Sequence, residues 1–392
     1  MTVHSLSPSQ AASIANGVYA LQERSVDQVR ERNAPMSSED PVLSDESGFS
    51  GTGADRFEGR SGNIFYSELT GFGYVARGNG ARAGEMLIAT RGTATVADAL
   101  TDLNFALVSG PSGRLVHSGF MSTWNSYTRQ LERALEGPAP TRIHCVGHSL
   151  GGALAMLNAE YLAQRGIAEV LVYTFGAPRV GDWFHRQAFV SAIGNSRTFR
   201  VYNVADPVPM IPLFPFFHVE GMAIDTGAGL IAPSAHRMAA TYAPAVAGKG
   251  WSDLRSASAQ RQRAIESQAE YDHALAMAML SPMGSGAALL LIGRAMRWLV
   301  GRALLVVGGS LLAVTATVLD RLAWLVSEGI ARCRELAEQA RGLFSAVMRF
   351  LGRAAVSVGE MGVAFVRWVL EMLWTHMRSL AVRAIRMASR RI

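Results

Sequence analysis

The stretch Ile143-His144-Cys145-Val146-Gly147-His148-Ser149-Leu150-Gly151-Gly152 decides the fold that this chain is expected to adopt. Apolar residues lead into Gly-x-Ser-x-Gly, and a helix-compatible Ala-Leu-Ala-Met-Leu run follows. A strand, a sharp turn and a helix in this order form a nucleophile elbow, in which the serine hydroxyl projects from the turn. The glycines on either side let the strand and the helix approach without collision. We therefore predict Ser149 as a nucleophile that precedes a helix from Leu150 to about Gln164.

The helix that begins at Leu150 is expected to present its positive end to the serine. The first N–H groups of a helix have no partner inside the helix, and they favour negative charge nearby. The backbone N–H of Leu150 is therefore predicted to stabilise an oxyanion that forms at Ser149.

A nucleophilic serine needs a base and an acid that orients the base, and in strand-elbow-helix hydrolases the acid precedes the histidine. Asp206 follows a strand-like segment, 197–205, which Pro207 ends. Acids at the carboxyl ends of strands lie where ligands bind in open α/β sheets. We predict Asp206 as the acid in preference to Asp182, because Gly-Asp-Trp at that position is typical of a helix N-cap.

Two histidines that follow Asp206 are candidates for the base. His218 comes after an apolar run, 212–217, and is compatible with a loop histidine that makes a structural hydrogen bond. His236 opens a helical pattern after a proline-containing loop. The residues alone do not decide which of the two histidines is the base.

Five blocks of the chain resemble the class 3, or fungal-type, lipase family, in the order that the family has. The blocks are 89–103, 116–124, 146–152, 173–181 and 203–212. The resemblance implies an α/β-hydrolase fold with a mostly parallel central sheet and flanking helices. It also implies that Thr93, which follows Arg91-Gly92, adds its backbone N–H to that of Leu150 in the oxyanion hole. His117 is expected to be architectural.

The resemblance also favours His236 over His218 as the base. The histidine block departs from the family pattern, because Tyr242 follows His236 with one residue more than expected. The segment 95–109 resembles the family's lid over an acyl groove, and its leucines, phenylalanine and valine suit a lipid chain.

The character of the chain changes near residue 275. The 274 residues before that point carry 22 basic and 25 acidic side chains, a net charge of −3, whereas the remainder carries 15 and 6, a net charge of +9. We predict a class 3 lipase-like domain over 1–274 and a helical, arginine-rich, membrane-associated region over 275–392.

The second region contains the uncharged run 303–319, which has 17 residues. As a helix this run would extend about 25 Å, the short end of a bilayer span. Further on, charged residues recur at helical spacing through 349–378, which predicts one amphipathic helix with a narrow charged stripe. We expect the region 284–380 to contact a lipid bilayer.

Several other classes of function are excluded by composition. The only lysine is Lys249, so the positive charge does not resemble a nucleic-acid-binding arm. Cys145 and Cys333 give neither a disulfide framework nor metal-ligand spacing, and no phosphate loop or dinucleotide fingerprint is present. We expect no cofactor and no metal. The polar residues 1–10 lack the features of a secretory signal peptide.

The sequence thus predicts a serine ester hydrolase that cleaves acyl esters of membrane glycerolipids, with glycerophospholipids preferred. One alternative is a membrane-inserting or partner-binding protein with a secondary esterase activity. The other is a resident membrane-anchored triacylglycerol or monoacylglycerol lipase. The organisation is similar to that of lipase effectors of bacterial type VI secretion. The region 275–392 predicts membrane association, and the likeness implies delivery into a target cell by a non-Sec route and an immunity or chaperone protein as a partner.

Overall fold

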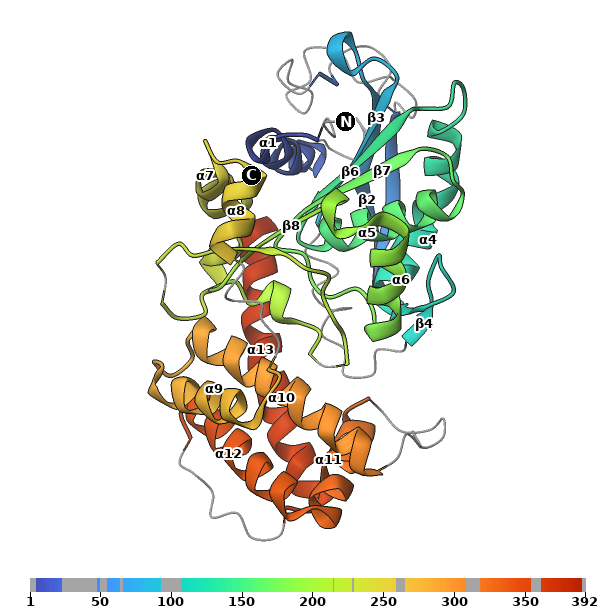
Figure 1. Cartoon of the computed structure of the whole chain (residues 1–392). Coiled ribbons are helices and arrows are strands. Elements are labelled where there is room, and N and C mark those ends of the chain that lie inside the picture. Colours follow the sequence, from blue (N-terminus) through green and yellow to red (C-terminus); the bar gives the residue numbers. More distant parts are fainter. Residues whose placement is uncertain are drawn as a thin grey trace. The chain divides into compact units, whose positions relative to one another are not determined.

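The computed structural model describes residues 5–22, 48–49, 55–63, 66–92, 107–213, 215–227, 229–258, 265–307, 318–353 and 361–389 (Figure 1). The chain divides into two compact units. The first unit comprises Met1–Thr226, Pro233–Arg261 and Ala381–Ile392, and the second comprises Gly227–Ala232 and Gln262–Leu380. The predicted boundary between residues 274 and 275 falls inside helix α9 (Gln268–Leu280).

A seven-stranded sheet forms the centre of the first unit, in the order β1-β2-β3-β6-β7-β8-β9. Its strands are β1 (Asp55–Asn63), β2 (Tyr66–Arg77), β3 (Glu85–Thr90), β6 (Arg142–His148), β7 (Glu169–Phe175), β8 (Thr198–Asn203) and β9 (Met222–Ile224). The pairs β1·β2 and β2·β3 are antiparallel, and every pair from β3 to β9 is parallel. The predicted α/β class with a mostly parallel sheet is confirmed.

The central strands consist of buried residues because helices cover the sheet on both faces. All six residues of β3 are buried, and so are six of the seven residues in each of β6 and β7. A parallel strand covered on both sides needs a nearly continuous apolar sequence rather than an alternating one. The run that leads into Ser149 meets this requirement.

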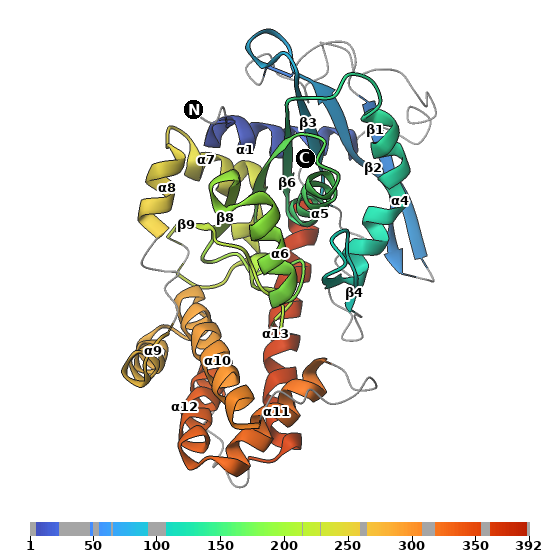
Figure 2. The same cartoon turned by 45° about the vertical axis from the view of Figure 1, so that its right-hand side comes forward.

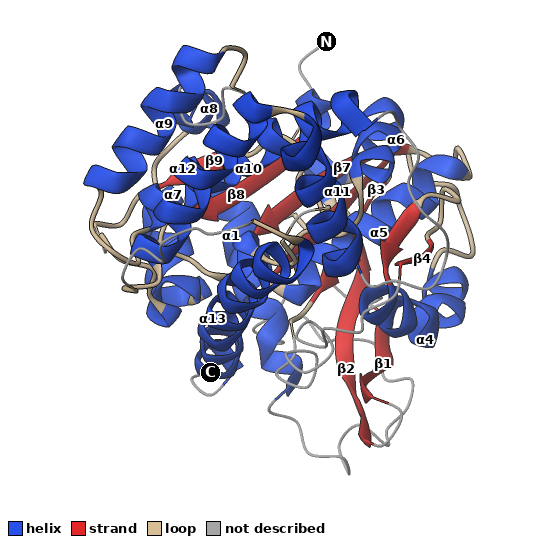
Figure 3. Cartoon of the chain, turned by 90° about the horizontal axis from the view of Figure 1, so that it is seen from below, coloured by secondary structure: helices blue, strands red, loops and turns tan. Residues whose placement is uncertain are grey.

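The helices of the first unit lie on the two sides of the sheet (Figure 2). Helices α4 (Ser118–Ala134), α5 (Leu150–Gln164) and α6 (Trp183–Ile193) lie on one side, and α1 (Pro8–Gly17), α7 (Ala243–Val246) and α8 (Trp251–Ser258) on the other. Figure 3 shows α1 and α5 on opposite sides of the strands. A separate hairpin joins β4 (Leu107–Ser109) to β5 (Leu115–His117).

Helix α1 closes one core of the first unit. It begins with a capping box between Ser7 and Gln10, ends at Gly17 and continues as a 3-10 turn, Val18–Gln22. Its apolar side chains join a core cluster with residues such as Val146, Phe175 and Tyr242.

The second unit consists of helices. They are α9, α10 (Gly286–Val307), α11 (Val318–Arg332), α12 (Arg334–Phe350) and α13 (Val363–Ser389), of which the last nine residues belong to the first unit. Apolar side chains of α10 and α12, such as Leu299 and Leu343, are buried. The prediction of one helix through 349–378 is wrong. Helix α12 ends at Phe350, and Gly352 takes a positive φ of 68°, a conformation that ends helices.

No helix built from the described residues is both long and apolar enough to cross a membrane. Helix α10 contains the first part of the uncharged run 303–319, but it also contains Arg294, Arg297 and Arg302. The part of that run from 308 to 317 lies outside the described residues.

Candidate active site

The candidate site begins at the turn between β6 and α5, where Ser149 lies. Ser149 has φ 58° and ψ −132°, and it is the one non-glycine residue with positive φ in the described part of the chain. Its backbone N–H donates to the carbonyl of Phe175 at 2.9 Å, which fixes the turn against the neighbouring strand. Such a conformation costs on the order of 1–3 kcal/mol and persists only where the surroundings enforce it.

The two glycines of the motif are required by close backbone contacts. A Cβ on Gly147 would lie 2.2 Å from the carbonyl oxygen of Gly151, and a Cβ on Gly151 would lie 2.2 Å from that of Thr90. No side chain fits at such distances. Glycine is therefore required at both positions by the close packing around the turn that carries Ser149.

The structure brings together Ser149, His236 and Asp206. The Ser149 Oγ lies 2.7 Å from His236 Nε2, and His236 Nδ1 lies 2.7 Å from Asp206 Oδ2. Since a carboxylate only accepts hydrogen bonds, Nδ1 carries the proton and Nε2 accepts from the serine. His236 and Asp206 are fully buried, and Ser149 is 2% exposed. This is the geometry of a nucleophile, a general base and an orienting acid.

The rival residues lie elsewhere. His218 makes a hydrogen bond of 2.7 Å from Nε2 to the carbonyl oxygen of Pro209. Asp182 is the N-cap of α6, where its side chain accepts from the backbone N–H of His185 at 2.8 Å. His117 is the N-cap of α4. Each of them has a local structural contact of the kind that its sequence context indicates.

Of the two predicted oxyanion donors, the structure describes Leu150 and not Thr93. Leu150 is the first residue of α5 and is fully buried, so its N–H lies at the helix end beside Ser149. Thr93 lies outside the described residues, as does most of the predicted lid, 95–106. The residue before it, Gly92, lies beside the serine, since a Cβ there would be 3.0 Å from Ser149 Cβ.

Tyr242 is a site residue that the sequence analysis missed. Its hydroxyl donates to Asp206 Oδ2 at 2.6 Å and accepts from the backbone N–H of Asn203 at 3.0 Å. The N–H of Val208 donates to the other carboxylate oxygen at 2.9 Å. Burial, together with the charge of Asp206, raises the pKa of Tyr242 well above its usual value, so it stays a donor. Asp206 is thus held by three donors, including His236.

A π-helix explains the additional residue in the histidine block. The segment Met238–Tyr242 is π-helical, and the N–H of Tyr242 donates to the carbonyl of Arg237. A π turn accommodates one residue more than an α turn and is frequent at functional sites. The insertion that separates this block from the family pattern is absorbed there, and Tyr242 still reaches Asp206.

His148 connects the elbow to the backbone of the base. Its Nε2 donates to the carbonyl oxygen of His236 at 2.8 Å, so its Nδ1 is the acceptor for the Tyr19 hydroxyl at 2.7 Å. Burial, together with the neighbouring His236, lowers the pKa of His148 well below its usual value. A neutral His148 places no charge beside the base.

The arrangement is suited to acyl transfer. It offers a polarised hydroxyl, a base within hydrogen-bond reach and a helix end for negative charge. No group of three or more histidine, cysteine, aspartate or glutamate side chains within the described ranges is placed to bind a metal ion.

Comparison with known proteins matches residues 87–216 to the family described as Lipase (class 3). This lipase segment contains Ser149, Leu150 and Asp206, and it ends before His236, whose place beside the serine comes from the structure alone.

Relatives of the lipase segment include enzymes of several kinds. The chain is 35% identical over 157 residues to secreted mono- and diacylglycerol lipase 1 of Fusarium solani, covering 38% of this chain and 45% of the relative. It is 34% identical to a lipase of Rhizomucor miehei, covering 37% and 42%, and 34% identical to phospholipase A1-II 4 of Oryza sativa subsp. japonica, covering 33% and 40%. The chain spans less than half the length of these curated relatives.

Among solved structures, the Rhizomucor miehei triacylglyceride lipase aligns with a TM-score of 0.40 and 24% identity. The alignment covers 55% of this chain and 78% of that one.

Replacement of the base tests the assignment of His236. We expect His236→Ala to lower kcat for a short-chain ester by roughly 10³-fold or more, because the serine loses its proton acceptor. The matched control is His218→Ala, which removes an imidazole that is bonded to the loop carbonyl of Pro209. Steady-state hydrolysis of p-nitrophenyl butyrate measures both. A larger loss of kcat in His218→Ala than in His236→Ala would make His218 the base.

Replacement of Tyr242 tests the support of the acid. Tyr242→Phe leaves the N–H of Asn203 without its acceptor and removes one donor from Asp206. We expect it to lower the free energy of unfolding by about 1–3 kcal/mol and kcat by on the order of tenfold. The control is Tyr161→Phe, whose hydroxyl contacts Glu132 at the exposed surface. Urea denaturation measures the free energy of unfolding, and ester hydrolysis measures kcat. Equal losses in Tyr242→Phe and Tyr161→Phe would contradict a role of Tyr242 in supporting Asp206.

Proposed function

We propose that this protein is a serine carboxylic-ester hydrolase of the lipase and phospholipase kind, acting on acyl esters of glycerolipids. The observation that supports the proposal most strongly is the chain of two 2.7 Å hydrogen bonds from Ser149 through His236 to Asp206. The class 3 lipase segment, whose relatives carry the names lipase and phospholipase A1, supports the substrate class.

The reaction follows from the geometry. Ser149 Oγ attacks the ester carbonyl carbon while His236 Nε2 takes the hydroxyl proton, and Asp206 stabilises the imidazolium. The N–H of Leu150 stabilises the oxyanion of the tetrahedral intermediate, with the N–H of Thr93 as the second predicted donor. The carbon–oxygen bond to the glycerol then breaks, and His236 returns the proton to the leaving alkoxide. A water molecule then attacks the carbonyl carbon of the acyl-enzyme while His236 Nε2 takes its proton. The bond to Ser149 Oγ breaks, His236 returns the proton to the serine, and the fatty acid leaves.

We further propose that the second unit brings the enzyme to a lipid surface. Large apolar side chains are exposed on it, including Leu280 at 78%, Met283 at 57% and Leu305 at 84%. The second unit carries 12 basic and 9 acidic side chains, a net charge of +3, which favours anionic lipids. Surface contact of this kind needs no membrane-spanning helix. The predicted delivery into a target cell and the predicted immunity or chaperone partner stay predictions.

Removal of the nucleophile tests the proposed activity. We expect Ser149→Ala to lower hydrolysis of p-nitrophenyl butyrate and of 1,2-dioleoylglycerol by roughly 10³-fold or more, because no other hydroxyl replaces Oγ at the elbow. An unchanged circular dichroism spectrum serves as the control for folding. A variant that hydrolyses both esters at the wild-type rate would exclude Ser149 as the nucleophile.

Vesicle flotation of the full chain tests the proposed lipid contact. We expect the chain to float with phosphatidylglycerol-containing vesicles and Leu280→Glu to bind about tenfold more weakly, since burial of one leucine contributes about 1.5–3 kcal/mol. The control His273→Glu adds the same negative charge at another exposed position of α9. Equal binding of the two variants, or a chain that stays with the vesicle-free fractions, would contradict the contact.

A further inference from the structure

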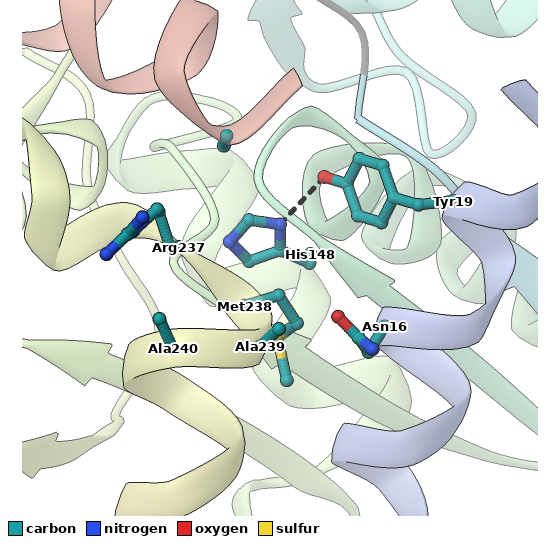
Figure 4. Close-up of a pocket in the computed structure, with 8 residues that line it drawn as sticks. Asn16, Tyr19, His148, Arg237, Met238, Ala239 and Ala240 are labelled. Carbon is teal, nitrogen blue, oxygen red and sulfur yellow. Dashed lines mark hydrogen bonds between the residues drawn. The ribbon is translucent and has the colours of Figure 1, made fainter. Parts of the chain in front are cut away.

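A small cavity of about 140 Å³ adjoins the candidate active site in the first unit. It is lined by Asn16, Tyr19, His148, Arg237, Met238, Ala239, Ala240 and Ala388. Figure 4 shows His148 between Tyr19 and Arg237, with the dashed hydrogen bond from Tyr19 to His148. A bound water needs about 10–15 Å³ of such space, so the cavity has room for on the order of ten waters, or for a phosphate group.

The cavity lies beside the reacting residues. Its lining includes His148 and Arg237, the chain neighbours of Ser149 and His236. It also includes Tyr19, whose hydroxyl lies beside the serine, since a Cβ on Gly92 would be 2.7 Å from that hydroxyl and 3.0 Å from Ser149 Cβ. In acyl transfer the base returns its proton to the leaving oxygen, so that oxygen lies within hydrogen-bond reach of His236 Nε2. His148, which lines the cavity, is bonded to the backbone of His236 at 2.8 Å. The alcohol part of an ester bound at Ser149 can therefore extend toward this cavity.

The charge of the lining favours an anion. Arg237 is the one charged side chain among the lining residues, and none of them is acidic. His148 adds no charge, because burial lowers its pKa well below the usual value. A lining whose described residues supply one guanidinium and no carboxylate attracts a negatively charged ligand.

Arg237 also has an unused hydrogen-bond donor. Its Nε is buried and has no hydrogen-bond partner among the described residues. A buried donor on a charged group that lacks an acceptor is costly, and an anionic oxygen would remove that cost. The guanidinium matches phosphate oxygens because its N–H groups form a planar fork.

We propose that Arg237 binds the phosphate of a glycerophospholipid in this cavity and thereby sets the enzyme's preference for phospholipids over neutral glycerides. The inference rests on the proposed hydrolase function and names its substrate class. Ser149 takes the acyl group, the ester carbon–oxygen bond breaks, and the lysophospholipid leaves with the proton from His236. Its phosphate is only a few bonds from the leaving oxygen, which places it near the residue that follows the base.

The first experiment compares two substrates with the same acyl chains. Dioleoyl phosphatidylglycerol and 1,2-dioleoylglycerol are presented in the same detergent micelles, and the ratio of their kcat/KM values is measured. We expect Arg237→Gln to lower this ratio by roughly 10- to 100-fold through loss of a charge-assisted hydrogen bond. Arg237→Lys keeps the charge without the fork and restores part of the ratio. The control Arg133→Gln, at an exposed position of α4, leaves the ratio as in the wild type.

The second experiment detects the anion directly. We expect sn-glycerol 3-phosphate to inhibit hydrolysis of p-nitrophenyl butyrate competitively, whereas glycerol at the same concentration does not. Arg237→Gln should lose this inhibition, and a merely structural role of Arg237 would not produce that loss. If Arg237→Gln does not fold, as judged by its melting temperature, the same comparison is made with Arg237→Lys, which should weaken the inhibition several-fold.

Two outcomes would overturn the inference. One is an unchanged substrate ratio in Arg237→Gln, which includes an equal fall of kcat/KM on both lipids, and the other is inhibition of that variant by glycerol 3-phosphate at the wild-type concentration. Both leave the hydrolase function intact. A wild-type protein that cleaves neither the lipids nor p-nitrophenyl butyrate would overturn the proposed function itself, and the inference with it.

Discussion

The positive φ of Ser149 is the constraint on which the rest of the site depends. The strained turn exists because strand β6, buried between two layers of helices, runs directly into helix α5. Gly147 and Gly151 allow the contact, since a Cβ on either residue would meet backbone at 2.2 Å. The same turn points the hydroxyl at His236 and sets the N-terminus of α5 beside it. The free energy that the turn costs is offset by burial of the surrounding apolar residues.

The carboxylate and the base are held by contacts between segments far apart in the chain. Asp206 follows β8 in the parallel sheet and is bonded by the N–H of Val208 and the hydroxyl of Tyr242. His148, which is bonded to Tyr19 129 residues away, donates to the backbone carbonyl oxygen of His236. The bond from His236 Nδ1 to Asp206 orients the imidazole toward Ser149, so the proton is taken without reorganisation of the site.

Local sequence was sufficient for the features that depend on local geometry. The elbow, the helix Leu150–Gln164 and the strand before Asp206 all follow from spacing and from residues such as Gly147 and Pro207. The contacts of Tyr242 and Tyr19 could not be read in this way, because they depend on which distant segments meet. The helix through 349–378 failed for a related reason. Charged residues at helical spacing on both sides of a helix break give the same periodicity as one continuous helix. Here α12 ends at Phe350, and Gly352 takes a positive φ.

The central claim is that Ser149 is the nucleophile of an acyl-transfer reaction, and covalent trapping tests it most directly. The full-length protein is treated with a fluorophosphonate, which reacts with activated serines, and the modified peptide is identified by mass spectrometry. The account predicts a single adduct on Ser149 that is absent from the protein carrying His236→Ala, because the hydroxyl is activated by that base. An adduct on another serine, or an unmodified Ser149 after prolonged treatment, would contradict it.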